Sequence, residues 1–154
     1  MNSRFFSLPE EKQQIILNAG FHVFSRNTYK KSPMSEIADA AGISKALLFH
    51  YFHNKKELYL FLWDTCARIT VEEMERSGCY EQKDLFNSMN YGMQAKMRIT
   101  RQYPDMAFFA VKAFYEKIRR FRRIFRKVWR NISRSMQREN CRSWTRKSLF
   151  PVLI

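Results

Sequence analysis

The sequence predicts an all-α protein, with a three-helix head that contains a helix-turn-helix, then a long connector helix and a shortened helical C-terminal region. The 154 residues include only four glycines and four prolines, and residues that favour long helices dominate the remainder. Helix start and stop residues follow one another closely through the first half of the chain. A chain of this length can bury the core of one domain, or of a small domain with a helical extension.

The first long helix is predicted to begin close to Ser7. Ser7 and Glu10 have the spacing of a capping box, with Pro9 in the first turn. Small and apolar residues then recur on one face, namely Ile16, Ala19, Gly20, Val23 and Phe24. This spacing predicts an amphipathic helix of about four turns. His22 falls off that face, so we expect it to be an exposed residue of the polar side.

A short second helix is predicted between Ser32 and Gly42. Ser32 is a suitable N-cap, Pro33 suits the first helical position, and Glu36 places negative charge near the positive helix end. The apolar face of this helix consists of Ile37, Ala38 and Ala41. Gly42 can adopt the positive φ that ends a helix.

The third helix follows at once, with Ser44 as its predicted N-cap. Leu48, Tyr51 and Phe52 are spaced to face inward. Two short helices joined by a three-residue turn with a glycine form a helix-turn-helix, and the second helix has a size that fits the DNA major groove. Ala38 lies at the predicted crossing, where a larger side chain would push the two helices apart.

Three blocks of sequence occur in a characteristic order, "IILNAGFHVF", "MSEIADAAGISKALLFHYF" and "NKKELYLFLW". Together they resemble the N-terminal DNA-binding region of TetR-type transcriptional regulators, the tetracycline repressor family. The resemblance covers residues 8–68, with the helix-turn-helix at about 33–53. It implies a regulator, expected to be a repressor, that binds a double-stranded DNA operator with an inverted repeat as a homodimer and is released by a small apolar or cationic effector.

The resemblance also implies individual DNA contacts, because in such regulators the third helix lies in the major groove. The positions that match are Ser32, Ser44, Lys45, Ala46, Leu47, Phe49, His50, Tyr51 and Lys55. Lys55, at the start of the connector, matches a lysine that contacts backbone phosphate. Ser32 matches a phosphate contact at a helix start, where a hydroxyl and free backbone N–H groups favour an anion.

The third helix departs from the family pattern at three positions. The family often has Gly, Thr and Tyr where this sequence has Ala46, Leu47 and Phe49. Two hydroxyls that could bond to phosphate or base are therefore absent. Recognition is expected to shift toward apolar contact with thymine methyl groups and toward DNA shape.

His50 and His53 have the spacing of a shared helix face, which raises the question of a metal site. A closed zinc site needs four ligands, and no cysteine lies at a matching short spacing. We therefore favour His50 as a phosphate or base contact. His53, where the family often has proline, is interpreted as a residue of the turn.

A long connector helix is predicted from Asn54 to Gly78. Asn54 and Glu57 form a second capping box, and Gly78 marks the end. Its apolar positions are Leu58, Leu62, Trp63, Ile69 and Met74. A rigid connector would fix the spacing between two DNA-binding heads.

The resemblance to TetR-type regulators implies that residues 69–116 form a partial helical ligand and dimerisation region. One stripe, Leu85, Phe86, Met89, Met93 and Met97, runs through a predicted helix that ends before Pro104. A second group, Met106, Phe108, Phe109, Ala110 and Phe114, opens the next helix. Stripes of soft apolar residues favour plain core over pocket lining.

The positive charge is concentrated in the last segment. Residues 1–116 hold 15 Lys and Arg against 13 Asp and Glu, whereas residues 117–154 hold 13 against 1. Apolar residues from Phe114 to Met136 alternate at spacings of four and three, which favours a basic amphipathic helix that packs, dimerises, or touches phosphate or an anionic membrane. Alternatively, the regulator is truncated or frameshifted after about Glu116, with no effector response. A third interpretation is a basic protein that binds nucleic acid or membrane nonspecifically through this tail.

Other functional classes find little support in the sequence. There is no glycine-rich phosphate loop and no converging set of catalytic residues, so we predict no enzyme and no cofactor. Cys66, Cys79 and Cys141 are odd in number and far apart, which disfavours a disulfide framework and a zinc site. The longest purely apolar run, Leu58 to Trp63, is too short to span a membrane, and no signal peptide is evident. The expected compartment is the cytoplasm.

Overall fold

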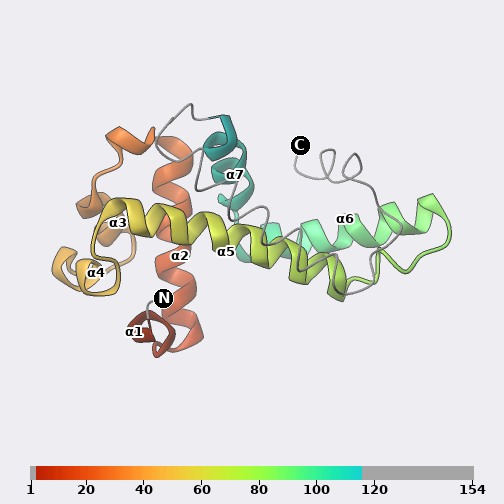
Figure 1. Cartoon of the computed structure of the whole chain (residues 1–154), viewed down its shortest axis with the longest axis horizontal. Coiled ribbons are helices and arrows are strands. Elements are labelled where there is room, and N and C mark those ends of the chain that lie inside the picture. Colours follow the sequence, from red (N-terminus) through yellow and green to blue (C-terminus); the bar gives the residue numbers. More distant parts are fainter. Residues whose placement is uncertain (1–2, 116–154) are drawn as a thin grey trace.

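The computed structural model describes residues 3–115, which are helical with short connections (Figure 1). The elements are α1 (Ser3–Phe6), α2 (Glu10–Arg26), the 3-10 turn η1 (Tyr29–Lys31), α3 (Met34–Ala40), α4 (Lys45–Tyr51), α5 (Lys55–Arg76), α6 (Leu85–Gln102) and α7 (Met106–Tyr115). The all-α prediction is confirmed for this part of the chain. No helix among these residues is both long and apolar enough to cross a bilayer. The predictions for the tail at 117–154 lie outside the described residues.

The central helix of the head is α2, which packs against α3, α5 and α7. The residues predicted on its apolar face are all buried, because their spacing keeps them on the side that meets these helices. His22 lies off that face with its side chain 45% exposed, as predicted, but it also has a partner. Its Nδ1 lies 2.8 Å from Oδ2 of Asp105, in the connection between α6 and α7. A polar contact therefore joins the head to the C-terminal helices.

The start of α2 also differs from the prediction. The helix begins at Glu10 with Pro9 at the N-cap position and no capping side chain. Ser7 instead donates a hydrogen bond to the carbonyl of Arg4, within the turn that follows α1. The predicted capping box does not form, because the Ser7 hydroxyl is already hydrogen-bonded to a carbonyl of α1. Phe5 of α1 is buried against the rings of Phe52 and Phe61.

The turn between α3 and α4 follows the prediction closely. Ala38 is fully buried where the two helices meet, and Gly42 has a φ of +66°. A residue with a Cβ is strained at such a φ, so glycine suits this turn. The backbone N–H of Ile43 donates to the carbonyl of Ala38. Leu48 and Phe52 are fully buried and hold α4 against the core.

The connector α5 runs the length of the molecule from the head to the loop before α6 (Figure 1). Oδ1 of Asn54 accepts from the backbone N–H of Glu57, as predicted. The reciprocal bond of the capping box is displaced by one residue, since the Glu57 carboxylate accepts from the backbone N–H of His53. Gly78, with a φ of +70°, follows the C-cap Ser77. The predicted bounds of the connector are confirmed.

Two cysteines lie in the described residues, and both are buried free thiols. Burial raises the pKa of Cys66 to about 12, so its thiolate is negligible near neutral pH. Cys66 belongs to the main core, and Cys79 belongs to a smaller one with Met74 and Ala95. These side chains act as small apolar residues of the packing.

The interpretation of the stripe on α6 as core is wrong. The stripe residues are more than half exposed, at 70% for Leu85, 79% for Phe86, 66% for Met89, 57% for Met93 and 51% for Met97. The side of α6 that packs on α5 consists of small residues and Ile99 instead. In α7, Met106, Phe109 and Ala110 are buried as predicted, but Phe108 and Phe114 are exposed.

Candidate nucleic-acid interface

One side of α4 is open to solvent, at the end of the molecule farthest from the loop between α5 and α6 (Figure 1). Ser44, Lys45, Ala46, Leu47, Phe49 and His50 are all exposed. Leu47 and Phe49 are 37% and 38% exposed, although they flank the fully buried Leu48. The helix therefore presents its first turn and two apolar side chains outward.

Ser44 caps the first turn of α4, as predicted. Its Oγ accepts from the backbone N–H of Leu47 at 3.1 Å. The helix start is thus fixed where the positive end of the helix dipole faces solvent. Lys45 follows directly, with its Nζ 6.0 Å from the centre of the Phe49 ring.

Lys55 is held between two elements of the head. Its Nζ lies 4.7 Å from the centre of the Tyr29 ring and donates to the carbonyl of Lys30 at 3.3 Å. These contacts tie the start of α5 to the 3-10 turn η1. Lys30 and Lys31 of that turn are exposed and lie beside Lys55 through this contact. Lys30 and Lys31 were not among the residues predicted from the sequence to meet DNA. The signal that could have found them is their position directly before Ser32 and Pro33, at the start of the second helix.

Two residues predicted to meet DNA lie below the surface. Ser32 is fully buried, and its hydroxyl donates to the carbonyl of Thr28 at 2.9 Å. It does not cap α3, whose N-cap position is Pro33. Tyr51 is 8% exposed, with its ring against Phe5. Ser32 therefore supports the approach of η1 to α3, and Tyr51 anchors the end of α4.

The two neighbouring histidines do not form a common site. His50 is exposed on α4, whereas Nδ1 of His53 lies 3.2 Å from the Glu57 carboxylate in the turn before α5. Within residues 3–115 no group of three His, Cys, Asp or Glu side chains is arranged to hold a metal ion.

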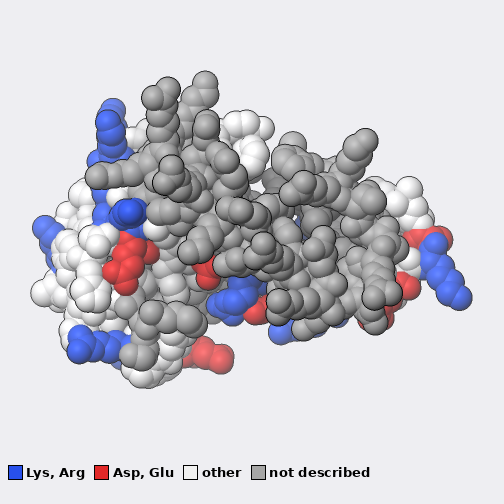
Figure 2. Space-filling view, in the orientation of Figure 1, with Lys and Arg blue, Asp and Glu red and all other residues white. Residues whose placement is uncertain are grey.

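Lys and Arg side chains are spread around the end of the molecule that carries α3 and α4, and the surface between them is mostly uncharged, with an acidic patch among them (Figure 2). The exposed lysines there are Lys30, Lys31, Lys45 and Lys56. Such an arrangement suits a polyanion whose charges flank an uncharged surface, as phosphates flank the base edges of a groove.

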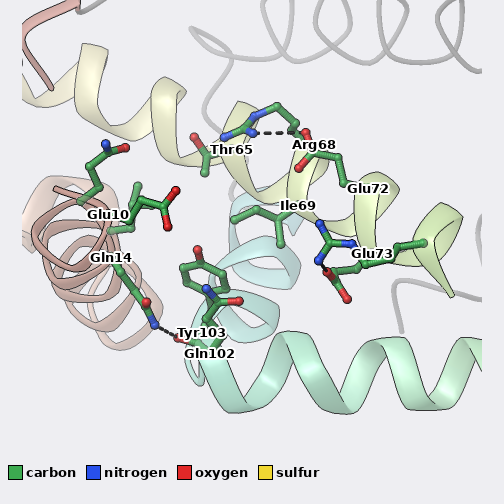
Figure 3. Close-up of a pocket in the computed structure, with 12 residues that line it drawn as sticks. Glu10, Gln14, Thr65, Arg68, Ile69, Glu72, Glu73, Gln102 and Tyr103 are labelled. Atoms are coloured by element: carbon green, nitrogen blue, oxygen red, sulfur yellow. Dashed lines mark hydrogen bonds and ion pairs between the residues drawn. The ribbon is translucent and has the colours of Figure 1, made fainter. Parts of the chain in front are cut away.

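A separate pocket of about 340 Å³ lies where α2, α5 and the end of α6 meet (Figure 3). Its lining includes Glu10, Gln14, Arg68, Glu72, Glu73, Gln102 and Tyr103. Nε2 of Gln14 donates to the carbonyl of Gln102 at 3.1 Å, and Arg68 pairs with Glu72 at 3.2 Å. Burial raises the pKa of Tyr103. The pocket is polar, and three carboxylates face it against the two guanidinium groups of Arg68 and Arg76.

The fold and this surface define an all-helical protein with a helix-turn-helix head on a long connector. The sequence model of the family described as "Bacterial regulatory proteins, tetR family" matches residues 16–61. The head is therefore a TetR-type N-terminal region, as the sequence motifs predicted.

Several known regulators are similar to this chain. The HTH-type transcriptional activator FasR of Mycolicibacterium smegmatis is 43% identical over 60 residues, which are 38% of this chain and 27% of the relative. The fatty acid metabolism regulator protein of Bacillus subtilis is 31% identical over 64 residues, 42% of this chain and 33% of the relative. A solved TetR family transcriptional regulator from Chloroflexus aurantiacus J-10-FL shares the fold. Its TM-score is 0.56 at 23% identity, over 81% of this chain and 58% of that one. The matched segments span about a third or less of these two curated relatives.

Proposed function

We propose that the protein is a sequence-specific DNA-binding transcriptional regulator rather than an enzyme, acting as a repressor in the cytoplasm. The main support is the outward face of α4, which carries Lys45, Leu47 and Phe49 at the surface while Leu48 fixes the helix below. The TetR-type match to residues 16–61 covers this same region. In this proposal α4 lies in the major groove.

The proposed contacts divide into two kinds. The proposed phosphate contacts come from two places. The first is the start of α4, with Ser44 and Lys45, and the second is Lys55 together with Lys30 and Lys31 of η1. Base contacts come from Leu47, Phe49 and His50, with Ala46 close to the DNA backbone. Ser32 and Tyr51 act beneath this surface by holding η1 and α4 in place, since both are buried.

Effector control is part of the proposal. A homodimer would bind an operator with an inverted repeat, and the spacing of its two heads would decide affinity. The polar pocket joins α2 of the head to α5 and the end of α6, so a ligand there could change that spacing. The polar lining favours the cationic type of effector over the apolar type, with Glu10 as the proposed carboxylate contact, since Glu72 and Glu73 already pair with arginines.

Replacing Lys45 tests the groove-facing assignment. We expect Lys45→Ala to weaken binding to duplex DNA selected by the protein from a random library by about 5-fold to 100-fold, with a shallower dependence on salt. Fluorescence anisotropy at several salt concentrations measures both. Lys83→Ala removes the same charge from the exposed loop before α6 and should leave binding unchanged. Equal losses in both variants would contradict the assignment.

The selected operator tests the apolar readout. If Leu47 and Phe49 touch thymine methyl groups, exchanging A·T for G·C pairs within the bound half-site should cost about 1–3 kcal/mol per critical pair. Leu47→Ala should reduce that preference. Binding that ignores these exchanges would rule the apolar readout out.

Removing residues 117–154 distinguishes a sequence-specific regulator from a protein that binds DNA only through the positive charge of its tail. A regulator of this kind keeps its preference for the selected operator over random DNA, although total affinity falls with 13 Lys and Arg removed. A protein that binds through its tail loses nearly all attachment to both. The second result would favour the nonspecific basic binder.

A further inference from the structure

Helix α1 lies beside the end of α4, in the part of the molecule that carries the candidate interface (Figure 1). Phe5 of α1 is 1% exposed. The centre of its ring lies 6.3 Å from that of Tyr51, the last residue of α4, and 5.3 Å from that of Phe52, the C-cap. The family match begins at residue 16 and does not include α1. A segment ahead of the matched region therefore contacts the helix that is proposed to read DNA.

Helix α4 has a separate support at each end. At its start, α4 packs on α3, and the backbone N–H of Ile43 in the turn between them donates to the carbonyl of Ala38 at 3.0 Å. At its end, Phe5, Phe52 and Phe61 of α5 form a cluster whose ring centres are 5.1–5.3 Å apart. A helix of seven residues has little stability of its own, so both supports are needed to fix its direction.

Hydrogen bonds hold α1 in place against α2. The Ser7 hydroxyl donates to the carbonyl of Arg4 at 2.8 Å, and the backbone N–H of Leu8 donates to the carbonyl of Phe5 at 3.2 Å. Nε2 of Gln13, in the first turn of α2, donates to the carbonyl of Leu8 at 2.7 Å. The Phe5 ring is therefore presented to α4 from a fixed backbone.

We propose that Phe5 is a positioning residue for DNA recognition, because its ring sets the direction of α4 relative to the rest of the head. This inference rests on the proposed function, since it concerns how the same interface is held. Phe5 is buried, so it acts through Phe52 and the end of α4 rather than by touching DNA. Phe49 and His50 lie in the second half of α4, and a tilt of that end would move them relative to the base edges.

The phosphate contacts are expected to depend less on Phe5. Lys30 and Lys31 belong to η1 and Lys55 begins α5, and Nζ of Lys55 donates to the carbonyl of Lys30. Binding to random DNA draws on phosphate contacts, which carry no sequence information. Losing the Phe5 ring should therefore lower the affinity for the selected operator more than the affinity for random DNA.

A pair of matched variants of the full chain tests this proposal. Phe5→Ala and Phe109→Ala each remove a ring that is 1% exposed, but Phe109 lies on α7, with its ring 5.3 Å from those of Phe21 and Tyr59. Phe5→Ala should weaken binding to the selected operator about tenfold or more, as the loss of a base contact would, and binding to random DNA about threefold or less. Phe109→Ala should change both affinities by about threefold or less. Fluorescence anisotropy measures them at a temperature where circular dichroism shows both variants folded.

A milder pair keeps the test decisive if either alanine variant fails to fold. Phe5→Leu and Phe109→Leu retain most of the apolar volume, and both should remain folded. Phe5→Leu should still weaken operator binding about threefold more than Phe109→Leu, because leucine lacks the ring that meets Phe52 and Phe61. Equal operator binding by the two leucine variants would contradict the proposal.

Amide hydrogen exchange without DNA tests the support of α4 directly. The backbone N–H of Phe52 donates to the carbonyl of Leu48 at 2.9 Å, whereas the hydrogen-bonded N–H of Ile43 lies at the opposite end of α4. In Phe5→Ala the exchange rate of Phe52 relative to that of Ile43 should rise about tenfold or more, and in Phe109→Ala this ratio should stay the same. Taking the ratio removes any general loss of stability.

Three results would overturn the proposal. They are an exchange ratio that Phe5→Ala leaves unchanged, equal losses of operator binding in Phe5→Ala and Phe109→Ala, and random-DNA binding that falls as much as operator binding in Phe5→Ala, as it would if Arg4 of α1 contacted phosphate directly. A chain that selects no operator would instead count against the proposed function, and the exchange ratio would still decide whether Phe5 holds α4.

Discussion

Replacing Leu48 with alanine should destabilise the protein by about 3–5 kcal/mol and abolish specific DNA binding. Leu48 is fully buried and is the inward residue at the middle of the seven-residue helix α4. A cavity at such a site costs the transfer energy of the lost methyl groups and the contacts around them. A short helix has little stability of its own, so losing this contact also loosens the surface that meets DNA. Urea unfolding followed by circular dichroism measures the loss.

The neighbouring leucine provides a matched control. Leu47→Ala makes the same chemical change one position earlier, where the side chain is 37% exposed. It should change the free energy of unfolding by about 0.5 kcal/mol or less, while still weakening binding to the selected operator. If both variants lost the same stability, the assignment of inward and outward faces on α4 would be wrong.

Replacing Gly20 with valine should cost about 2 kcal/mol, despite the higher helix propensity of valine. A Cβ at Gly20 would lie 2.6 Å from Cδ1 of Leu62, so either the fully buried Leu62 side chain must shift or α2 and α5 must move apart. Overpacking a core by this much costs about 1–3 kcal/mol. Since this crossing joins the head to the connector, the angle of the head should change as well. Thermal and urea unfolding report the loss in stability.

A double variant tests whether the loss comes from this contact. Leu62→Ala alone should cost about 3 kcal/mol, as Leu62 is fully buried. Combined with Gly20→Val, the total should be at least about 1 kcal/mol smaller than the sum of the two single losses, because the valine fills the space that the leucine leaves. Gly92→Val is a helical control, since a Cβ there would meet the flexible end of Met74 at 3.4 Å and Cβ of Cys79 at 4.0 Å, and it should cost less than half as much. Strict additivity would show that Gly20 acts through some other contact.

The sequence predicted the helix-turn-helix because its signals are local. Ser44 caps α4 through the backbone N–H of Leu47, and Gly42 supplies the positive φ of the turn. The cap and the turn each involve residues no more than three positions apart, so the local sequence is enough to predict their geometry. The inward positions Leu48 and Phe52 follow from helical periodicity for the same reason.

The caps that failed depended on what came before each helix. Serine is a favoured N-cap residue, and both Ser7 and Ser32 precede a helix. In the structure, however, each hydroxyl donates to a carbonyl three or four residues earlier. The accepting carbonyls belong to Arg4 in helix α1 and to Thr28, which directly precedes the 3-10 turn η1. A serine hydroxyl then has two local partners, and sequence spacing does not decide between them.

Periodicity likewise predicted a helix that contains Leu85 to Met97 and ends before Pro104, but not which face of it would be buried. The large apolar residues from Leu85 to Met97 looked like core, yet α5 packs on the small residues Gly92 and Ala95. Close approach between two helices favours small side chains, so the tertiary contact overrides the hydrophobic pattern.

The sequence by itself determined the all-helical class, the bounds of the connector, and the TetR-type character of residues 16–61. These follow from capping, glycine turns and spacing, which act within a few residues. The tertiary structure alone decided that Ser32 lies inside, that His22 meets Asp105 across the molecule, and that the apolar residues of α6 from Leu85 to Met97 are exposed. Each of these depends on which helices meet, and that is set by the fit of side chains distant in sequence.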